Sequence, residues 1–425
     1  MSVDLSLIVS KIDEKELVQL ALEMGMTYGP TGHEKEIGEF IYNWLKNNGF
    51  EVMKQPVAGE RFNVIGYLRG TGNGLSLIFN SHMDTEFGGP EDIWMIGDRE
   101  MLETIYTNSW VKDNRIYGLG VINDRGLMAT FLIAAKAIKE SGITLKGDLI
   151  LTAVVGEIGM APVDEYQGPE YLGKGTGTQH LVNHGVIADY ALVAEASRFA
   201  LTWMENGAGY FKITVKGVGG IYTPHIQRPV PLEENPNAVV RMSKVIQAIE
   251  EWALEYEQKN RYEFELGVAI PKVNIGGIRG GLPYKPSKTV GMCCLYVDVR
   301  IPPNKSPMSV KRELEELLEE INIKGTVEIY MFRRGYEGKG IEVLRDAIEK
   351  VHFNFFGEKP PKVASVITSV WRDINIFNQA GIPAITYGPG LALTRDGVEI
   401  EDFVKASKLY AGIALEICNQ EAPKK

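Results

Sequence analysis

A short apolar strand that ends in two polar side chains constrains this chain more than any other sequence feature. Leu75–Phe79 is a short, mostly apolar run, which is typical of a strand buried on both faces. It leads into His82 and Asp84. Side chains two residues apart in a strand point the same way, so both are expected at the carboxyl end of a core strand, where open α/β sheets bind ligands. Taken alone, the pair is better explained as solvated loop residues, although an imidazole oriented by a carboxylate is also what a metal-bound histidine needs.

Three further acidic residues occupy comparable places along the chain. Asp124 comes just before an apolar helix, and Glu157 and Glu195 each follow an apolar run that is typical of a buried strand. From its position alone, Asp124 is better explained as an N-cap, but a carboxylate at a positive helix end also stays ionised and can bridge cations. Oxygen ligands with one imidazole suit Zn²⁺, Mn²⁺ or a similar ion. Together with His82, these residues predict a divalent metal site.

The length and the order of the expected elements indicate two domains. A single hydrophobic core stops growing near roughly 250–300 residues, and this chain has 425. Apolar strands alternate with helices in 1–206 and again in 334–425, whereas 207–333 has the pattern of a small antiparallel domain. We therefore expect a mixed-sheet α/β domain made of the two outer segments, with an inserted α+β domain of ferredoxin-like type.

Charge and composition restrict the partners and the compartment. Lys and Arg number 45 against 55 Asp and Glu, which gives a net charge of −10. This balance opposes binding to nucleic acid or anionic lipid, and the chain has no apolar run long enough for a membrane span. The first twenty residues lack the apolar core of a signal peptide, and two of the three cysteines are adjacent, which argues against a disulfide framework. We expect a cytoplasmic protein that acts on a small molecule, without nucleic-acid or membrane partners.

Several short motifs then follow one another in an order that is specific to one family. In chain order they are His82-x-Asp84, Gly118-x-Gly120 followed by Asp124, Glu157-x-Gly159, Glu195, Asp298-x-Arg300 and Tyr387-Gly-Pro-Gly390. With this set, nearly the whole chain resembles the zinc aminoacylase and carboxypeptidase family, which includes acetylornithine deacetylase, succinyl-diaminopimelate desuccinylase and glutamate carboxypeptidase. The resemblance implies a two-metal catalytic domain with a dimerisation lid, and cleavage of the C–N bond of N-acyl amino acids or small peptides.

The resemblance assigns roles to individual residues. His82, Asp124 and Glu195 match a complete set of ligands for one metal, with Asp124 as the bridging carboxylate. Asp84 matches the residue that orients the histidine. Glu157 matches a ligand of the second metal.

The chain departs from the family pattern at the second metal. Gly156 occupies the position of the family's general base, and Leu391-Ala-Leu-Thr-Arg395 has no counterpart of its second histidine ligand. Only Asp124 and Glu157 would remain for that ion, so it would bind weakly at most. We therefore expect one Zn²⁺ or Mn²⁺ per chain with open positions for water and substrate, and Glu157 as the base that takes a proton from a water activated by the metal.

The inserted domain contributes further candidates through the resemblance. His225 lies near the family's lid histidine, which reaches across a dimer to stabilise negative charge, and a surface role is equally consistent with its position. Arg300 is a candidate for substrate binding, and an ion pair with Asp298 explains it equally well. Arg279 and Tyr284 are candidates to replace a missing family asparagine. The resemblance also implies a homodimer or a higher homo-oligomer formed through this domain.

Two functions within the hydrolase class and one outside it fit these residues. The first is hydrolysis of an amide in an N-acyl amino acid or peptide. The second is removal of an amine from an activated aromatic ring, as in nitroanthranilate aminohydrolase, a relative that departs from the dinuclear pattern. The third is a catalytically silent, dimeric binding protein. The intact set of His82, Asp124 and Glu195 argues against the third, because buried carboxylates without a cation are costly.

Overall fold

The chain forms two compact units in the computed structural model, which describes residues 3–89, 92–106, 108–390 and 397–422. The first unit comprises Met1–Trp203, Glu337–Val363 and Arg372–Lys425, and the second comprises Met204–Tyr336 and Ala364–Trp371. The sequence predicted boundaries at 206/207 and 333/334, and these lie at 203/204 and 336/337 in the structure.

The segment 364–371 corrects the predicted division, which placed it in the outer domain. Two of its side chains form hydrogen bonds with the backbone of the second unit. The backbone N–H of Ile270 donates to Ser369 Oγ at 3.0 Å, and the hydroxyl of Thr368 donates to the carbonyl of Val268 at 3.4 Å. A short return of the chain therefore completes the second unit.

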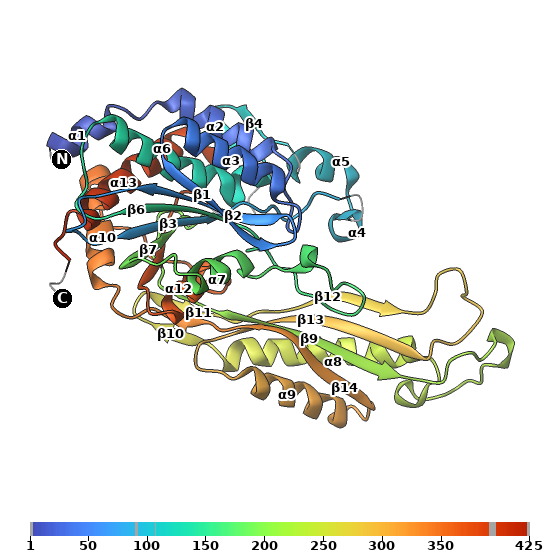
Figure 1. The fold of residues 1–425 in the computed structure, drawn as a ribbon. Coiled ribbons are helices and arrows are strands. Elements are labelled where there is room, and N and C mark those ends of the chain that lie inside the picture. The colour runs from blue at the N-terminus through green and yellow to red at the C-terminus, as the bar shows by residue number, and fades with distance from the viewer. Residues whose placement is uncertain (1–2, 90–91, 107, 391–396, 423–425) are drawn as a thin grey trace. The chain divides into compact units, whose positions relative to one another are not determined.

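A mixed sheet organises the first unit (Figure 1). Within the described residues it has six strands in the order β1-β2-β6-β3-β7-β16. The pairs β1–β2 and β2–β6 are antiparallel, whereas β6, β3, β7 and β16 are parallel to one another. The carboxyl ends of these parallel strands therefore meet at one edge. The strands are β1 (Glu51–Ala58), β2 (Arg61–Leu68), β3 (Leu77–His82), β6 (Leu149–Val154), β7 (Tyr190–Val193) and β16 (Ala384–Thr386).

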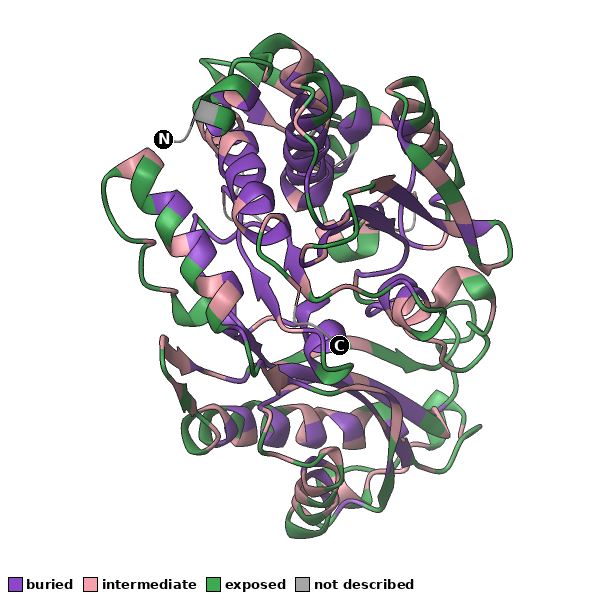
Figure 2. Cartoon of the chain, turned by 60° about the vertical axis from the view of Figure 1, so that its left-hand side comes forward, coloured by how far each residue is buried: buried purple, intermediate pink, exposed green. Residues whose placement is uncertain are grey.

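Helices cover both faces of this sheet, with α6 and α13 on one face and α7 and α12 on the other (Figure 1). On the first face the ring of Phe79 lies 5.8 Å from that of Phe131 and 5.4 Å from that of Tyr410. On the second, Ile78 packs in a cluster with Phe377. Burial is concentrated in the strands and the helices that cover them (Figure 2). These helices are α6 (Gly126–Glu140), α7 (Thr176–Asn183), α12 (Ile374–Gln379) and α13 (Ile400–Cys418).

The remaining regular elements of the first unit surround this core. The helix α3, for example, buries Ile37, Ile41 and Leu45 along one stripe, as its apolar periodicity requires. These elements are α1 (Val3–Val9), α2 (Glu14–Met26), α3 (Lys35–Asn47), α4 (Ile93–Ile96), α5 (Arg99–Met101), α10 (Glu342–Phe356), β4 (Trp110–Lys112), β5 (Arg115–Tyr117) and β17 (Val398–Glu399).

The second unit is built on an antiparallel sheet with two long helices. Within the described residues the sheet has four strands in the order β12-β13-β9-β14. The chain order β9-α8-β12-β13-α9-β14 is that of a ferredoxin-like fold, and α8 and α9 pack their apolar stripes on the sheet. The elements are β8 (Met204–Glu205), β9 (Gly207–Lys216), α8 (Ala238–Lys259), β10 (Tyr262–Phe264), β11 (Gly267–Ala269), β12 (Val273–Gly280), β13 (Met292–Ile301), α9 (Pro307–Glu320), β14 (Gly325–Arg333), β15 (Tyr336–Glu337) and α11 (Ser365–Thr368).

This architecture confirms the predicted mixed-sheet α/β domain with an inserted α+β domain. None of the described helices is long and apolar enough to cross a membrane.

Candidate metal centre

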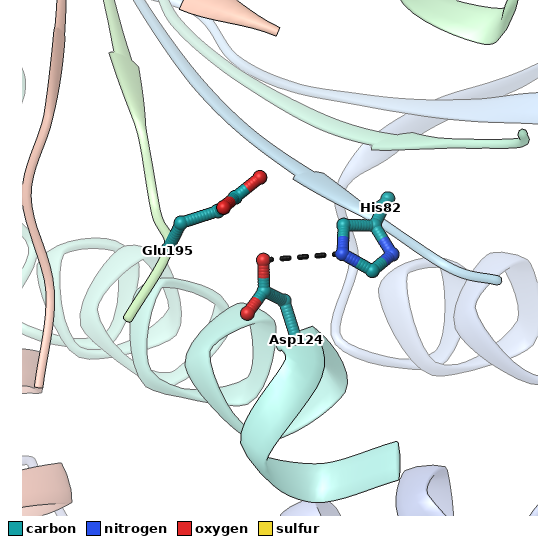
Figure 3. Close-up of side chains that lie close together, drawn as sticks. All are labelled: His82, Asp124 and Glu195. Atoms are coloured by element: carbon teal, nitrogen blue, oxygen red, sulfur yellow. Dashed lines mark ion pairs between the residues drawn. The ribbon is translucent and has the colours of Figure 1, made fainter. Parts of the chain in front are cut away.

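Three buried side chains from distant parts of the sequence converge at the carboxyl edge of the sheet. His82 is the last residue of β3, Asp124 lies in the turn before α6, and Glu195 follows β7. One ligand atom from each lies within 4.8 Å of the others, and the three side chains point toward one another (Figure 3). The three side chains are therefore grouped as predicted, because neighbouring parallel strands end at the same edge of the sheet.

The imidazole of His82 is oriented by the residue predicted for this role, but mainly through the backbone. Its Nδ1 lies 2.9 Å from the carbonyl oxygen of Asp84 and 3.5 Å from the carboxylate Oδ1. Because a carbonyl only accepts hydrogen bonds, Nδ1 carries the proton in this contact. The other ring nitrogen, Nε2, then lies 3.2 Å from Oδ2 of Asp124. His82 therefore presents Nε2 to the cluster as the atom able to bind a metal.

The carboxylate of Asp84 holds the loop after β6. It accepts hydrogen bonds from the backbone N–H groups of Glu157 (3.1 Å) and Ile158 (3.0 Å), and from the hydroxyl of Thr31 (2.8 Å). Burial raises the pKa of Asp84, but the hydrogen bond and the charge of His82, with the bonds from Thr31 and Ile158, outweigh it and hold the pKa below its usual range. Asp84 therefore fixes both the imidazole and the loop that carries Glu157.

Several polar atoms of this cluster are buried without a hydrogen-bond partner among the described residues. In the described part of the chain, His82 Nε2 and both carboxylate oxygens of Asp124 are buried without a hydrogen-bond partner. Burial raises the pKa of Asp124, and burial with the charge of Asp124 raises that of Glu195 well above its usual range. Burial lowers the pKa of His82, but the charges of Asp124 and Asp84 raise it well above its usual value. Such a set holds protons until a cation replaces them, so these residues fit a divalent metal.

Glu157 lies beside this group. Its Oε2 is 3.9 Å from His82 Nε2. Burial raises the pKa of its carboxyl group, the charge of His82 opposes the rise, and the charges of Asp84 and Asp124 add to it. Because its pKa is raised, this carboxyl group, when ionised, is a stronger proton acceptor than that of an ordinary glutamate.

Arg372 and Asp373 lie at the same edge of the sheet, although the sequence did not single them out. The guanidinium Nε of Arg372 donates to Oε2 of Glu195, and Nη2 donates to the carbonyl of Ala196 at 3.2 Å. Asp373 accepts hydrogen bonds from Thr178 Oγ1 (2.5 Å) and Asn80 Nδ2 (3.1 Å). Burial and the charge of Glu157 raise the pKa of Asp373 to about 7. The only sequence signal was an adjacent Arg-Asp pair before a short apolar helix.

The structure gives Gly156 a local role. Its φ is +64°, and a Cβ built there would lie 2.6 Å from Arg61 Nη2 and 2.7 Å from the carbonyl oxygen of Leu172. Arg61 is itself buried in a bidentate ion pair with Glu34. A side chain at position 156 would therefore point at Arg61, so the glycine is explained by packing as well as by a missing base.

The expected second metal would have Asp124 and Glu157 as ligands. The segment in which the family's second histidine ligand was sought, Leu391 to Arg395, lies outside the described residues. Among the residues that are described, a group of three or more candidate ligands forms only at His82, Asp124 and Glu195.

The four candidates from the inserted segment all belong to the second unit. His225 is exposed at the end of a single helical turn, with its ring 6.0 Å from that of Tyr222. Arg300 forms the alternative ion pair with Asp298, at 2.9 Å. Arg279 is exposed on β12 and Tyr284 is 77% exposed in the following turn. Their roles toward a substrate stay predictions.

Comparisons with known proteins match almost the full length of the chain. The family described as Peptidase family M20/M25/M40 matches residues 78–416. N-formyl-4-amino-5-aminomethyl-2-methylpyrimidine deformylase of Bacillus subtilis is 25% identical, over 97% of each chain. Acetylornithine deacetylase of Salmonella typhimurium is 27% identical, over 82% of this chain and 81% of that protein.

Solved structures share the fold at low sequence identity. The dipeptidase Dug1p of Saccharomyces cerevisiae has a TM-score of 0.75 at 12% identity and covers 100% of both chains. YXEP of Bacillus subtilis, described as a dinuclear metal-binding peptidase, has a TM-score of 0.60 at 13% identity and covers 96% of this chain and 99% of that one.

Proposed function

Because the chain belongs to peptidase family M20/M25/M40, whose relatives hydrolyse amide C–N bonds, we propose that it removes a small acyl group from an N-acyl compound at a site with one divalent cation, Zn²⁺ or Mn²⁺. The observation that carries this proposal is the convergence of His82, Asp124 and Glu195 within 4.8 Å. Relatives named as a deformylase and a deacetylase support a formyl or acetyl amide as the substrate class.

The proposed roles follow from the contacts of each residue. His82 Nε2, Asp124 and Glu195 would hold the cation, which when bound supplies a Lewis acid that lowers the pKa of a water. Asp84 keeps the imidazole in the tautomer that leaves Nε2 available. Glu157 accepts a proton from water and returns it to the leaving amine, because its carboxyl lies beside the cluster and burial raises its pKa.

One cation is proposed because the described residues supply one three-ligand group. The structural relative YXEP is described as dinuclear. Within the described residues of this chain, a second ion would have only Asp124 and Glu157 as ligands. Two ligands would bind such an ion weakly at most.

Self-association through the second unit is part of the proposal. The strand β12 lies at the edge of its sheet, and apolar side chains on or near it are exposed, with Ile278 at 54% and Leu282 at 50%. An exposed edge strand with apolar side chains favours pairing with another chain. Light scattering should give the mass of a dimer or a higher oligomer, and Ile278→Lys should reduce it.

The decisive experiment combines metal content with a substrate panel. Purified protein should contain about one equivalent of Zn²⁺ or Mn²⁺ by mass spectrometry and should hydrolyse N-formyl or N-acetyl amides. His82→Ala should lose the metal and the activity, whereas His184→Ala, an exposed histidine on α7's C-terminal end, should keep both. Turnover of amino-substituted aromatic acids alone would favour the ring deaminase. Protein without bound metal and without turnover would favour the binding protein.

A further inference from the structure

The side chain of Arg372 places a permanent positive charge on one of the proposed metal ligands. It is 4% exposed, and its Nε donates to Oε2 of Glu195. A second bond, from Nη2 to the carbonyl of Ala196 (3.2 Å), ties the guanidinium to the backbone next to that ligand. Because the guanidinium does not lose its proton in proteins, this charge is present at every working pH.

The backbone around Arg372 keeps it in this place. The N–H of Asn375 donates to the carbonyl of Arg372 at 3.1 Å at the start of α12. The next side chain, Asp373, is held by Thr178 and Asn80. The backbone at Arg372 is therefore held in place. Its contact with Glu195 is made by a buried side chain and not by a mobile one on the surface.

The charges around His82 explain why a second cation is needed. Asp84, Asp124, Glu157 and Glu195 are all buried at this edge of the sheet. Through its Nε, the guanidinium of Arg372 places one positive charge in direct contact with Oε2 of Glu195 in this group. One divalent ion would leave part of this negative charge uncompensated, and buried charges require compensation.

We propose that the guanidinium of Arg372, held against Oε2 of Glu195, serves as the second cation of this centre, and that its positive charge limits the centre to a single divalent ion. This inference rests on the proposed function, since it assumes that Glu195 is a metal ligand. It adds a role for a residue outside the expected ligand set, and it gives a physical reason for a mononuclear centre in a fold whose relative YXEP is described as dinuclear.

The two possible roles of Arg372 predict opposite effects on metal affinity when its charge is removed. If Arg372 is a second cation, its loss frees a carboxylate oxygen and removes a repulsive charge, so metal binding becomes tighter or a second ion enters. If Arg372 only orients Glu195, its loss weakens metal binding by about 10- to 100-fold, as for other residues that support a ligand.

The experiment titrates metal-free protein with Mn²⁺ by calorimetry and counts bound ions by mass spectrometry. The native protein should bind one equivalent. Arg372→Gln should bind Mn²⁺ about tenfold more tightly or take up a second equivalent, and Arg372→Lys, which retains the charge, should stay within about threefold of the native affinity.

Arg61→Gln is the matched control, because it breaks another buried Arg–Glu pair (3% and 1% exposed) whose carboxylate, Glu34, is not a proposed ligand. Its Mn²⁺ affinity should be unchanged. Two equivalents in the native protein, or weaker binding by Arg372→Gln, would overturn the inference, and the first result needs no folded variant. Native protein that binds no Mn²⁺ would instead overturn the proposed function itself.

Discussion

At the scale of single residues, burial decides what the acidic groups around His82 can do. Glu157 is 7% exposed, and the cause of its raised pKa is first burial and then the balance of nearby charges. The raised pKa makes the ionised carboxyl of Glu157 a stronger proton acceptor than that of an exposed glutamate. Its 3.9 Å distance from His82 Nε2 leaves it outside the tight three-residue group. We therefore expect Glu157 to transfer protons rather than to hold the metal.

We expect Glu157→Gln to reduce kcat/KM by about 100-fold or more, because a well-placed base contributes about 10²- to 10⁴-fold. The amide has nearly the same shape but cannot accept the proton. Metal content should remain at the native level, as measured by mass spectrometry alongside the kinetics. Glu140→Gln, an exposed residue at the end of α6, is the control and should have native kinetics. Unchanged turnover in Glu157→Gln, or loss of the metal, would contradict the assigned role.

His352 supplies a pH dependence of stability that is separate from the metal centre. It is 2% exposed on α10, and its Nδ1 accepts a hydrogen bond from the hydroxyl of Tyr387 at 2.6 Å. Burial lowers the pKa of His352 from 6.5 to about 4. Between these two pKa values the unfolded chain binds a proton that the folded chain does not. The stability that comes from keeping His352 neutral is therefore fully present above pH 6.5 and is lost as the pH falls toward 4.

The expected loss is about 2 kcal/mol of unfolding free energy between pH 7 and pH 5 from this group. Urea unfolding at both pH values measures it. His352→Gln, which retains an acceptor for Tyr387, should show a smaller decrease than the native protein. His184→Gln changes an exposed histidine and should leave the decrease as it is. An equal decrease in His352→Gln and native protein would show that another group is responsible.

The residues that could be predicted from sequence share one property. His82, Asp84, Glu157 and Glu195 each stand at or just after an apolar run whose end marks the edge of the sheet. Arg372 could not be predicted in this way, because its partner Glu195 is 177 residues away in sequence. Only the packing of the start of α12 beside the end of β7 creates that contact. The family resemblance did not supply it either.

At the scale of elements, the loop between β6 and α7 connects the sheet to the proposed base. Gly156, Glu157 and Ile158 follow β6 directly, and Asp84 holds the last two through their N–H groups. The N–H of Gly156 donates to Oε1 of Glu34 at 3.1 Å. The loop therefore depends on buried carboxylates on both sides, which fix its path. The roles of Glu34 and Arg61 could not be predicted from the sequence, because their contacts with each other and with Gly156 join residues far apart along the chain.

We expect Gly156→Ala to destabilise the protein by roughly 2–3 kcal/mol, because the new Cβ combines a strained left-handed backbone with a clash against Arg61. Gly185→Ala is the matched control. It also has a positive φ, of +82°, but nothing lies within 4 Å of its Cβ, so it should cost only about 1 kcal/mol. Urea unfolding compares the two. Equal costs would show that the space around position 156 is less restricted than the structure indicates.

The same geometry makes Gly156→Glu informative about chemistry. If a base were simply absent at this position, the new carboxylate should raise turnover. Because a Cβ there points at Arg61 and the carbonyl of Leu172, we expect no gain in kcat and a loss of stability at least as large as that of Gly156→Ala. Steady-state kinetics and urea unfolding of the same preparation measure both. A faster enzyme would show that position 156 does face the reacting groups.

At the scale of the whole molecule, the division into two units was predictable because the two parts use different patterns. Parallel core strands appear in the sequence as continuous apolar runs, whereas burial alternates along much of β12 and the second half of β13 in the second unit. The return of 364–371 to the second unit was not predictable, since eight residues carry no periodicity long enough to assign. Hydrophobic periodicity therefore identifies whole domains better than it identifies short segments that return from one domain to the other.

The proposed metal ligands all belong to the first unit, so metal binding should stabilise that unit selectively. A ligand that binds only the folded state at 100 times its Kd adds about 2.7 kcal/mol. We expect calorimetric scans to show a higher Tm for the first unit with Mn²⁺ and a lower one after chelation. His82→Ala should abolish the shift, whereas His225→Ala, in the second unit, should retain it because it removes no ligand of this cluster. An equal Mn²⁺ shift in His82→Ala would mean that the ion stabilises the protein elsewhere, and the centre at the edge of the sheet would lose its main physical support.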